Sequence, residues 1–205
     1  MKQTPTPQHP QQQPAVTVVP ATCNRRRAVL CWLARFIRNA LAVVGLLSII
    51  YHTCFHLSVV VSGSMAPTLQ GDDITPRDWI LSERVSYWFR EPRRWEVVEF
   101  WTPEQMVVAK RVVGLPDEDI AIRDGRAFVN GAPVPVPEAL SFLHYVDQGL
   151  LSNGMQRNCG TGYFLLGDDS EDSYDSRYEG PVDRRTFNGR VRLIVWPPSR
   201  IGFVR

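Results

Sequence analysis

The feature that most constrains this chain is a run of 22 residues, Ala40 to Val61, without a formal charge. At 1.5 Å of rise per residue a helix of this length spans about 30 Å, the thickness of the hydrocarbon core of a bilayer. The first 38 residues hold six basic residues and no acid. Basic residues beside a span favour the inner side of the membrane. We therefore predict a single transmembrane helix, with everything after Val61 on the opposite side from the N-terminus.

A cleaved signal peptide is the alternative to an uncleaved span. Its apolar region would be shorter and would end in a small-x-small cleavage site, which this segment lacks. Ser48, His52, Thr53 and His56 are costly in lipid unless they are hydrogen-bonded or lie near the interface. The run length still favours an uncleaved span.

Composition divides the chain into three parts. Residues 1–24 are rich in proline and glutamine and have little to bury, which predicts a disordered tail. Residues 25–61 comprise the basic flank and the transmembrane helix. Residues 62–205 are expected to form one β-rich domain, because an apolar content of 44% and a charged content of 21% are globular values.

Beyond Val61 the pattern is that of short strands. Runs rich in β-branched and aromatic residues, separated by charged or proline-containing turns, lie at 79–81, 97–101, 107–113, 163–166 and 191–196. Residues 120–131 have the Asp-Gly and Asn-Gly dipeptides of hairpin turns. No long amphipathic helix follows Val61, and residues 133–162 are irregular. The fold predicted is mainly β: a curled, barrel-like antiparallel sheet on a single N-terminal membrane helix.

Charge and cysteine usage exclude several function classes. A net charge of +2 is too small to indicate a nucleic-acid partner. The four cysteines have no metal-ligand spacing, and Cys159 alone lies in the β-rich part. We therefore expect neither a structural metal site nor a disulfide framework.

Ser64 is a candidate nucleophile. Residues 62–69 read Ser-Gly-Ser-Met-Ala-Pro-Thr-Leu, and this glycine and proline favour a rigid, exposed turn. A serine hydroxyl attacks well only when a neighbouring base takes its proton. A Ser-His-Asp triad would have to use His144, the single histidine of the β-rich part, whose context favours a surface or packing role.

Lys110 is the better candidate base. It lies in an otherwise apolar strand, where desolvation lowers the pKa of an ammonium group toward the pH at which the amine accepts a proton. We expect the adjacent Arg111 to point to the opposite face of the strand and to stay in water. The alternative is a lysine that extends from an edge strand to solvent.

Three separated motifs stand in the order of one known family. They are Ser-Gly-Ser-Met-x-Pro-Thr-Leu at 62–69, Lys-Arg-Val-Val-Gly-Leu-Pro at 110–116, and Gly-Asp-Asp-Ser-Glu-Asp-Ser-Tyr-Asp-Ser-Arg at 167–177. Together they resemble the type I signal peptidase family over residues 60–195. The resemblance implies a membrane-anchored serine endopeptidase that removes N-terminal signal or targeting peptides from translocated precursor proteins.

The same resemblance implies the catalytic roles. Ser64 matches the nucleophile and Lys110 the general base. Ser62 matches the hydroxyl that binds the oxyanion together with the backbone N–H of Ser64. No metal and no organic cofactor is implied.

Three further residues match the positions that support the lysine. Ser173 matches the serine that orients it, and Asp175 and Arg177 match the pair that props the site. Because Asp175 and Arg177 are two residues apart, on a strand they would share a face and could pair with each other. We expect them to act first as scaffold.

The resemblance also implies how the substrate binds. An extended peptide would add as a strand between the segment before Ser64 and the strand carrying Lys110. A shallow apolar pocket for a small side chain at the cleavage site matches Val60, Met65, Leu69 and Ala109. Precursor proteins and the lipid bilayer are the partners implied.

The branch of the family is predicted from three features. Only 57 residues separate Lys110 from Asp168, one span is present, and residues 195–200 read Val-Trp-Pro-Pro-Ser-Arg. These resemble the mitochondrial inner-membrane peptidase subunits, and the Asp-Ser-Arg at 175–177 resembles the first catalytic subunit. A domain in the intermembrane space and a homologous partner subunit would follow.

Other interpretations stay open. One is a bacterial plasma-membrane leader peptidase of the same family, and another is a catalytically inactive, membrane-bound partner subunit. A self-cleaving transcription regulator shares the serine–lysine chemistry but would need an N-terminal DNA-binding domain in place of the tail and the apolar span.

Overall fold

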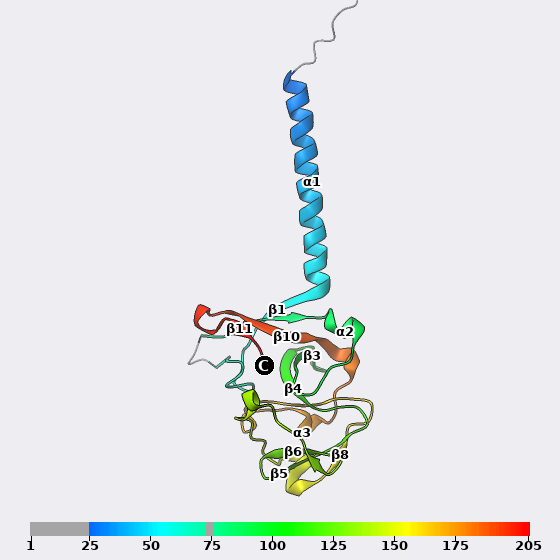
Figure 1. Cartoon of the computed structure of the whole chain (residues 1–205), viewed down its shortest axis with the longest axis vertical. Helices are drawn as coiled ribbons and strands as arrows, with labels where there is room; N and C mark the ends of the chain where they lie inside the picture. The colour runs from blue at the N-terminus through cyan, green and yellow to red at the C-terminus, as the bar shows by residue number, and fades with distance from the viewer. Residues whose placement is uncertain (1–24, 73–75) are drawn as a thin grey trace, which may run out of the picture. The chain divides into compact units, whose positions relative to one another are not determined.

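A computed structural model of the chain describes residues 25–72 and 76–205. The predicted tail of residues 1–24 lies outside the described residues. The chain divides into two compact units, with the boundary between Gly45 and Leu46. All of the described strands belong to the second unit (Figure 1).

The N-terminal helix α1 runs over 30 residues, Arg25–Cys54. Its part Arg27–Cys54 is long and apolar enough to cross a membrane, with a mean hydropathy of 1.8 in an 18-residue window. None of that window is buried by the part of the chain that the structure describes. A long helix that is apolar on all sides and exposed along its length is typical of a membrane span.

The helix ends earlier than the sequence predicted. The expected boundary was Val61, but α1 ends at Cys54 and Phe55–Val59 forms strand β1. This strand pairs with β2 (Trp79–Glu83), with Leu57 opposite Leu81. This uncharged segment is an edge strand in which apolar residues alternate with His56 and Ser58, rather than a continuation of the helix. The β-rich domain therefore begins at Phe55 rather than at residue 62.

Seven antiparallel strands form the main sheet. Their order is β1-β2-β10-β3-β4-β9, with β11 paired to β10. The bounds of the five strands after β2 are Val97–Trp101 (β3), Val107–Gly114 (β4), Phe164–Leu166 (β9), Phe187–Trp196 (β10) and Gly202–Phe203 (β11).

The main sheet is curled but not closed. Side chains of His56 and Ser58 on β1 contact Glu99 on β3, although β2 and β10 lie between these strands in the sheet. The described edges, β1 and β9, do not pair with each other. The predicted fold class, a mainly antiparallel β domain with an N-terminal apolar helix, is confirmed.

A second sheet of four strands has the order β7-β6-β5-β8. Its hairpin of β5 (Asp119–Arg123) and β6 (Arg126–Val129) was predicted, and Asp124 and Gly125 at its turn both have positive φ. Figure 1 shows β5, β6 and β8 gathered apart from β1, β10 and β11. The strands β7 (Ala132–Pro133) and β8 (Arg157–Asn158) have only two residues each, too few for a periodic pattern.

Short helical turns complete the unit. They are α2 (Ser86–Phe89), α3 (Ser176–Glu179) and the 3₁₀ turns Glu138–Leu140, Gly149–Gly154, Arg184–Thr186 and Pro198–Arg200. Each of them is shorter than a stable isolated helix and depends on tertiary packing.

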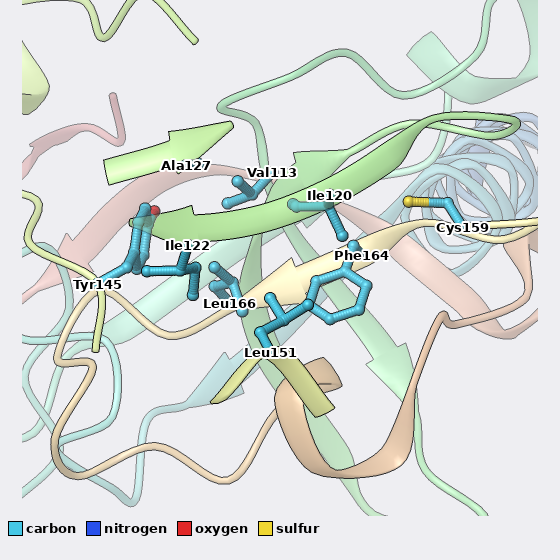
Figure 2. Packing of buried hydrophobic residues seen from close by; sticks show 9 residues of the cluster. All are labelled: Val113, Ile120, Ile122, Ala127, Tyr145, Leu151, Cys159, Phe164 and Leu166. Carbon is cyan, nitrogen blue, oxygen red and sulfur yellow. The ribbon is translucent and has the colours of Figure 1, made fainter. Parts of the chain in front are cut away.

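One buried cluster joins the two sheets. Figure 2 shows its nine side chains, which come from β4, β5, β6, β9 and the loops around Tyr145, Leu151 and Cys159. Ile120 of β5 and Phe164 of β9 both belong to it, one from each sheet. This packing fixes the second sheet against β4, the strand that carries Lys110.

A second cluster lies beneath the serine motif. Met65 and Leu69 of that motif pack with Val97 of β3 and with Val191 and Ile194 of β10, two strands of the main sheet. The motif is therefore attached to the sheet by two fully buried side chains, one on each side of Pro67.

The expectation that Arg111 stays in water is wrong. Its side chain is fully buried, and its guanidinium donates to both carboxylate oxygens of Asp168, at 2.7 and 2.6 Å. The remaining donors reach the backbone oxygens of Trp95 and Arg205 and the hydroxyl of Thr68. Both faces of β4 are covered at this point, so alternation along the strand does not lead to solvent.

Arg111→Leu is expected to lower the free energy of unfolding by about 3–5 kcal/mol, because it leaves the Asp168 carboxylate buried without its partner. Urea unfolding followed by tryptophan fluorescence measures this change. Arg126→Leu, at an exposed position of β6, is the control and should change stability by less than about 0.5 kcal/mol. Equal stability of the two variants would show that the buried pair does not hold the domain together.

Candidate active site

The serine motif forms a tight turn against the sheet. The Ala66 amide donates to the Gly63 carbonyl at 2.7 Å, and the Leu69 amide donates to the Met65 carbonyl at 2.8 Å. Gly71 approaches this turn so closely that a Cβ there would lie 2.6 Å from the Ser62 nitrogen. Ser64 is therefore held on a well-supported turn, as its sequence context predicted.

Lys110 brings its amine to Ser64. Nζ lies 2.7 Å from the Ser64 Oγ and 2.9 Å from the Ser173 Oγ. The lysine is only 4% exposed, so its alternative role as a solvent-directed edge lysine is wrong. His144 is exposed and lies against Gly125 on the hairpin turn, in agreement with a surface or packing role.

Burial changes the acidity of Lys110. Desolvation is the largest influence and lowers the pKa of its ammonium group from 10.5 to about 8. The negative charge of Asp175 raises the pKa and the positive charge of Arg177 lowers it. A substantial fraction of Lys110 is therefore neutral near pH 8, and a neutral amine 2.7 Å from a hydroxyl can accept its proton.

Asp175 connects the lysine-facing serine to a buried arginine. The Ser173 hydroxyl donates to Asp175 Oδ2 at 2.7 Å, and the Arg177 guanidinium donates to both oxygens of the same carboxylate at 2.9 and 2.8 Å. Burial by itself would raise the pKa of Asp175. Hydrogen bonds from Arg177 and from the Gly167 amide outweigh it, and the net pKa is lowered.

The pairing of Asp175 with Arg177 was expected, but on a strand. Instead Asp175 is the N-cap of α3 and accepts from the Arg177 amide at 3.1 Å. A residue with an extended backbone before a helical turn places its carboxylate over that turn. The two side chains can therefore meet although they belong to no common strand face.

Ser62 lies beside Ser64. Its Oγ is 3.2 Å from the Ser64 Oγ, and its side chain is exposed. The structure thus brings Ser62, Ser64, Lys110, Ser173 and Asp175 into one connected group. These residues are far apart in the sequence, and they meet because β9, which pairs with β4, leads into the loop that carries Ser173.

A cleft of about 730 Å³ opens at this group. Of the four residues predicted to line the substrate pocket, Val60, Met65 and Ala109 do so. Leu69 does not: it is fully buried in the cluster beneath, where it packs with Met65. Its position in the motif is therefore explained by the core.

Sequence reasoning missed the acidic lining of the cleft. Among the described residues, five carboxylates besides Asp175 line it: Glu99, Glu104, Glu171, Asp172 and Glu179. Glu99 was missed because it follows two valines in a strand. The sequence there does not alternate clearly between apolar and polar residues, so it does not show which face the Glu99 side chain takes. Among the described residues, no group of three or more His, Cys, Asp or Glu side chains is arranged to hold a metal ion.

A comparison with protein families identifies the architecture. The family model for signal peptidase, peptidase S26, matches residues 33–196, which is most of the chain. The chain belongs to this family. It is accordingly a serine endopeptidase of the signal peptidase I type, as the motifs indicated.

Curated relatives come from several organisms. The chain is 31% identical over 152 residues to signal peptidase I of Leptolyngbya laminosa, covering 70% of this chain and 70% of that protein. It is 33% identical over 138 residues to signal peptidase I V of Bacillus subtilis, covering 62% and 78%. It is 31% identical over 151 residues to mitochondrial inner membrane protease subunit 1 of Mus musculus, covering 72% and 74%.

Gly167→Ala is expected to reduce the endopeptidase rate by about 100-fold, because a misplacement of about 1 Å at reacting groups costs that much. An added Cβ would lie 2.5 Å from both the Ser173 Cβ and the Ser64 carbonyl oxygen, and would push the two serines apart. Initial rates with a fluorogenic peptide measure the loss. Gly202→Ala, whose Cβ would meet nothing closer than 3.9 Å, should keep the wild-type rate. A wild-type rate in Gly167→Ala would show that the site tolerates this displacement.

Proposed function

We propose that this chain removes N-terminal targeting peptides from translocated precursor proteins, with Ser64 as nucleophile and Lys110 as general base. The observation that carries the proposal is the 2.7 Å contact between Lys110 Nζ and Ser64 Oγ at a lysine whose pKa is about 8. Membership of the signal peptidase family supports the reaction class.

The reaction divides into acylation and deacylation. Neutral Lys110 takes the Ser64 proton while Oγ attacks the scissile carbonyl carbon. The resulting ammonium gives that proton to the leaving amine as the C–N bond breaks, and an ester to Ser64 remains. Lys110 then takes a proton from water, the hydroxide attacks the ester, and Ser64 regains its proton as the targeting peptide leaves.

Ser62 and the backbone N–H of Ser64 form the proposed oxyanion site. The Ser62 hydroxyl is exposed to the cleft and lies 3.2 Å from the attacking oxygen, close enough to reach a carbonyl oxygen held by Ser64. One donor placed at a developing oxyanion contributes about 3–4 kcal/mol to the stability of the transition state.

Ser173, Asp175 and Arg177 act as positioning residues. Ser173 accepts from the lysine and donates to Asp175, so one rotamer of Lys110 is favoured. Arg177 is fully buried, and it fixes both oxygens of Asp175. Rigid placement of the base lowers the entropic cost of reaching the transition state.

The substrate is proposed to add to the open edge of β4. Val107–Lys110 pair with β3 on one side, but β9 pairs with β4 only from Arg111 onward. The free edge of these four residues faces the cleft, where an extended peptide can form main-chain hydrogen bonds. Val60, Met65 and Ala109 then form the small apolar pocket for the residue before the scissile bond, and Leu69 supports Met65 from below.

The proposed membrane placement has two parts: how the chain is anchored, and which membrane holds it. Helix α1 is proposed to anchor the enzyme as a single span, with the catalytic domain on the far side from the basic N-terminal flank. The mitochondrial inner membrane, with a homologous partner subunit, stays a prediction supported by one relative, while bacterial enzymes match the chain equally well.

Ser64→Ala and Lys110→Met should each lower precursor cleavage by at least about 10³-fold, because each removes one partner of a unit that works together. The assay uses the full chain in detergent and a precursor with a small-x-small site, with product followed by gel and mass spectrometry. His144→Ala and Ser141→Ala, both at exposed positions, are the controls and should cleave at the wild-type rate.

Cleavage that survives Ser64→Ala would contradict the proposed mechanism. A folded wild-type chain that cleaves nothing alone, yet restores activity to a homologous catalytic subunit, would favour the inactive partner subunit instead. Loss of cleavage in His144→Ala would revive a histidine base.

A further inference from the structure

We propose that Arg192 and Arg90 bind the phosphate group of an anionic phospholipid at the membrane end of the β-rich domain. The inference rests on the part of the proposed function that makes α1 a membrane anchor. It concerns a pocket that shares no lining residue with the cleft at Ser64 and Lys110, and that the reaction does not use.

This second pocket, the juxtamembrane pocket, has a volume of about 570 Å³. Phe55, Val85 and Phe89 form its apolar side, and Arg90 and Arg192 are the basic residues among the described ones that line it. Phe55 is the first residue after α1, and Phe89 is the last residue of α2. The last turns of α1, from Leu46 onward, belong to the same compact unit as the pocket. Apolar and cationic groups are therefore combined beside the end of α1.

The end of α1 lies at the boundary of the hydrocarbon core if the helix spans a membrane. Residues 40–54 have no formal charge and rise about 22 Å along the helix, less than the roughly 30 Å of a hydrocarbon core. Tyr51 in the last turn is exposed, and tyrosine is enriched at the depth of the lipid headgroups. The Cys54 carbonyl accepts from the Arg84 amide at 2.9 Å. The headgroup region therefore reaches the segment that leads into α2.

Helix α2 presents large apolar side chains to the surroundings at this level. Phe89 is 83% exposed and Trp88 is 56% exposed. Apolar side chains of this size are costly to leave in water, and tryptophan is enriched at membrane–water interfaces. Contact with the acyl chains and glycerol of a lipid removes that cost. The turn thus supplies the apolar contacts that a phospholipid needs beside its phosphate.

Arg192 is the cation available to a ligand. It is the extra residue between Val191 and Leu193, at a register shift in the pairing of β10 with β2, and such a bulge re-aims a side chain. The half-buried Arg192 side chain forms no hydrogen bond or ion pair within the part of the chain that the structure describes. All five of its N–H donors remain for a ligand, and their fork matches two phosphate oxygens.

Arg90 keeps part of its donor capacity. Its guanidinium donates once to the Glu91 carbonyl, at 3.0 Å, and twice to the Glu96 carboxylate, at 3.1 and 2.7 Å. An arginine has five N–H donors, so two remain for a ligand. The ion pair with Glu96 also fixes the orientation of the guanidinium before any lipid binds. Arg90 is therefore a preorganised second contact for the phosphate.

Three arginine side chains are close enough here to influence one another. Burial is the largest influence on the pKa of Arg190 and lowers it, while the charge of Glu96 raises it. The positive charges of Arg192 and Arg90 lower that pKa further. The three guanidinium groups therefore repel one another, and a phosphate bound between two of them reduces this repulsion.

Glu83 is the one acid among the described residues that line the pocket. It is only 8% exposed, and one of its carboxylate oxygens accepts from the Ser86 amide at 2.8 Å. Its charge attracts Arg90, as the charge of Glu96 does. Two glutamates thus face three arginines, and the positive charge left over lies at Arg192, the arginine without a partner among the described residues.

The test measures the lipid that the full chain in detergent retains in native mass spectrometry. Dioleoyl phosphatidylglycerol and dioleoyl phosphatidylcholine are offered at equal concentration. Both have a phosphate diester and the same acyl chains, but only phosphatidylglycerol is anionic. Wild type should retain phosphatidylglycerol about tenfold more tightly, which corresponds to about 1.4 kcal/mol and is close to the lower limit for a hydrogen bond to a charged group.

Arg192→Gln removes the charge and keeps a polar side chain. It should reduce the preference for phosphatidylglycerol to less than about threefold, because one charge-assisted contact is lost. It should still cleave a precursor in detergent at the wild-type rate, since Arg192 does not line the catalytic cleft. Two exposed arginines provide matched controls, Arg126→Gln on β6 and Arg27→Gln in the basic flank. Both controls should keep most of the preference.

A second measurement needs no variant. Phosphatidylglycerol with a photoreactive diazirine in its acyl chain should label the tryptic peptide of residues 85–90, which contains α2, in the wild-type chain. Labelling confined to α1 overturns the inference, whether or not Arg192→Gln folds. Inorganic phosphate at the concentration of the lipid should not displace phosphatidylglycerol, and displacement would assign the pocket to a soluble phosphate instead.

Equal retention of the two lipids by wild type, or an unchanged preference in Arg192→Gln, also overturns the inference. A preference that is lost in Arg27→Gln and kept in Arg192→Gln would assign the lipid to the basic flank. Neither readout depends on catalysis. Failure of the proposed reaction would appear separately, as a precursor that wild type does not cleave or that is cleaved equally well after Ser64→Ala. Failure of the proposed anchor would appear as a chain that stays soluble without detergent.

Discussion

The burial of Lys110 is the constraint on which the rest of the site depends. An ammonium group removed from water loses hydration free energy, so the neutral amine becomes accessible near pH 8. The same burial places Nζ between Ser64 and Ser173, at 2.7 and 2.9 Å. A more exposed lysine would keep its proton, and Ser64 would lack the base that we propose for it. The fold therefore buries one ionisable side chain, Lys110, and the charges of its neighbours offset the cost of burying its ammonium form only in part.

Two buried ion pairs make that arrangement rigid. Arg111 and Lys110 are adjacent on β4 and point to opposite faces, and Arg111 binds Asp168 at the start of the loop that carries Ser173. Arg177 binds Asp175 at the end of that loop. The loop is thus fixed at both ends by guanidinium–carboxylate pairs. Such pairs contribute little net stability compared with apolar packing, but each orients its partner in two hydrogen bonds.

Much of this could be predicted from the sequence. The strands with clear β patterns and the Asp-Gly hairpin form where expected, because local propensity and turn chemistry agree there. The predicted end of α1 was wrong because an uncharged edge strand follows the helix without a change in composition. The expectation that Arg111 stays in water was wrong, because the alternation of side chains along a strand does not show whether other parts of the chain cover its second face. Leu69 was expected in the pocket but lies in the core, and Glu99, for which no role was predicted, lines the cleft, since only the curl of the sheet decides which side chains reach it.

A direct titration of Lys110 tests the account most sharply. The chain has only two lysines, Lys2 and Lys110, so labelling lysine with ¹³C or ¹⁵N for NMR in detergent gives two side-chain signals, and Lys110→Arg assigns them. We predict a midpoint of about 8 for Lys110. An ordinary lysine titrates near about 10.4. A midpoint for Lys110 at that ordinary value would mean that the amine is charged at working pH, and Ser64 would need another base.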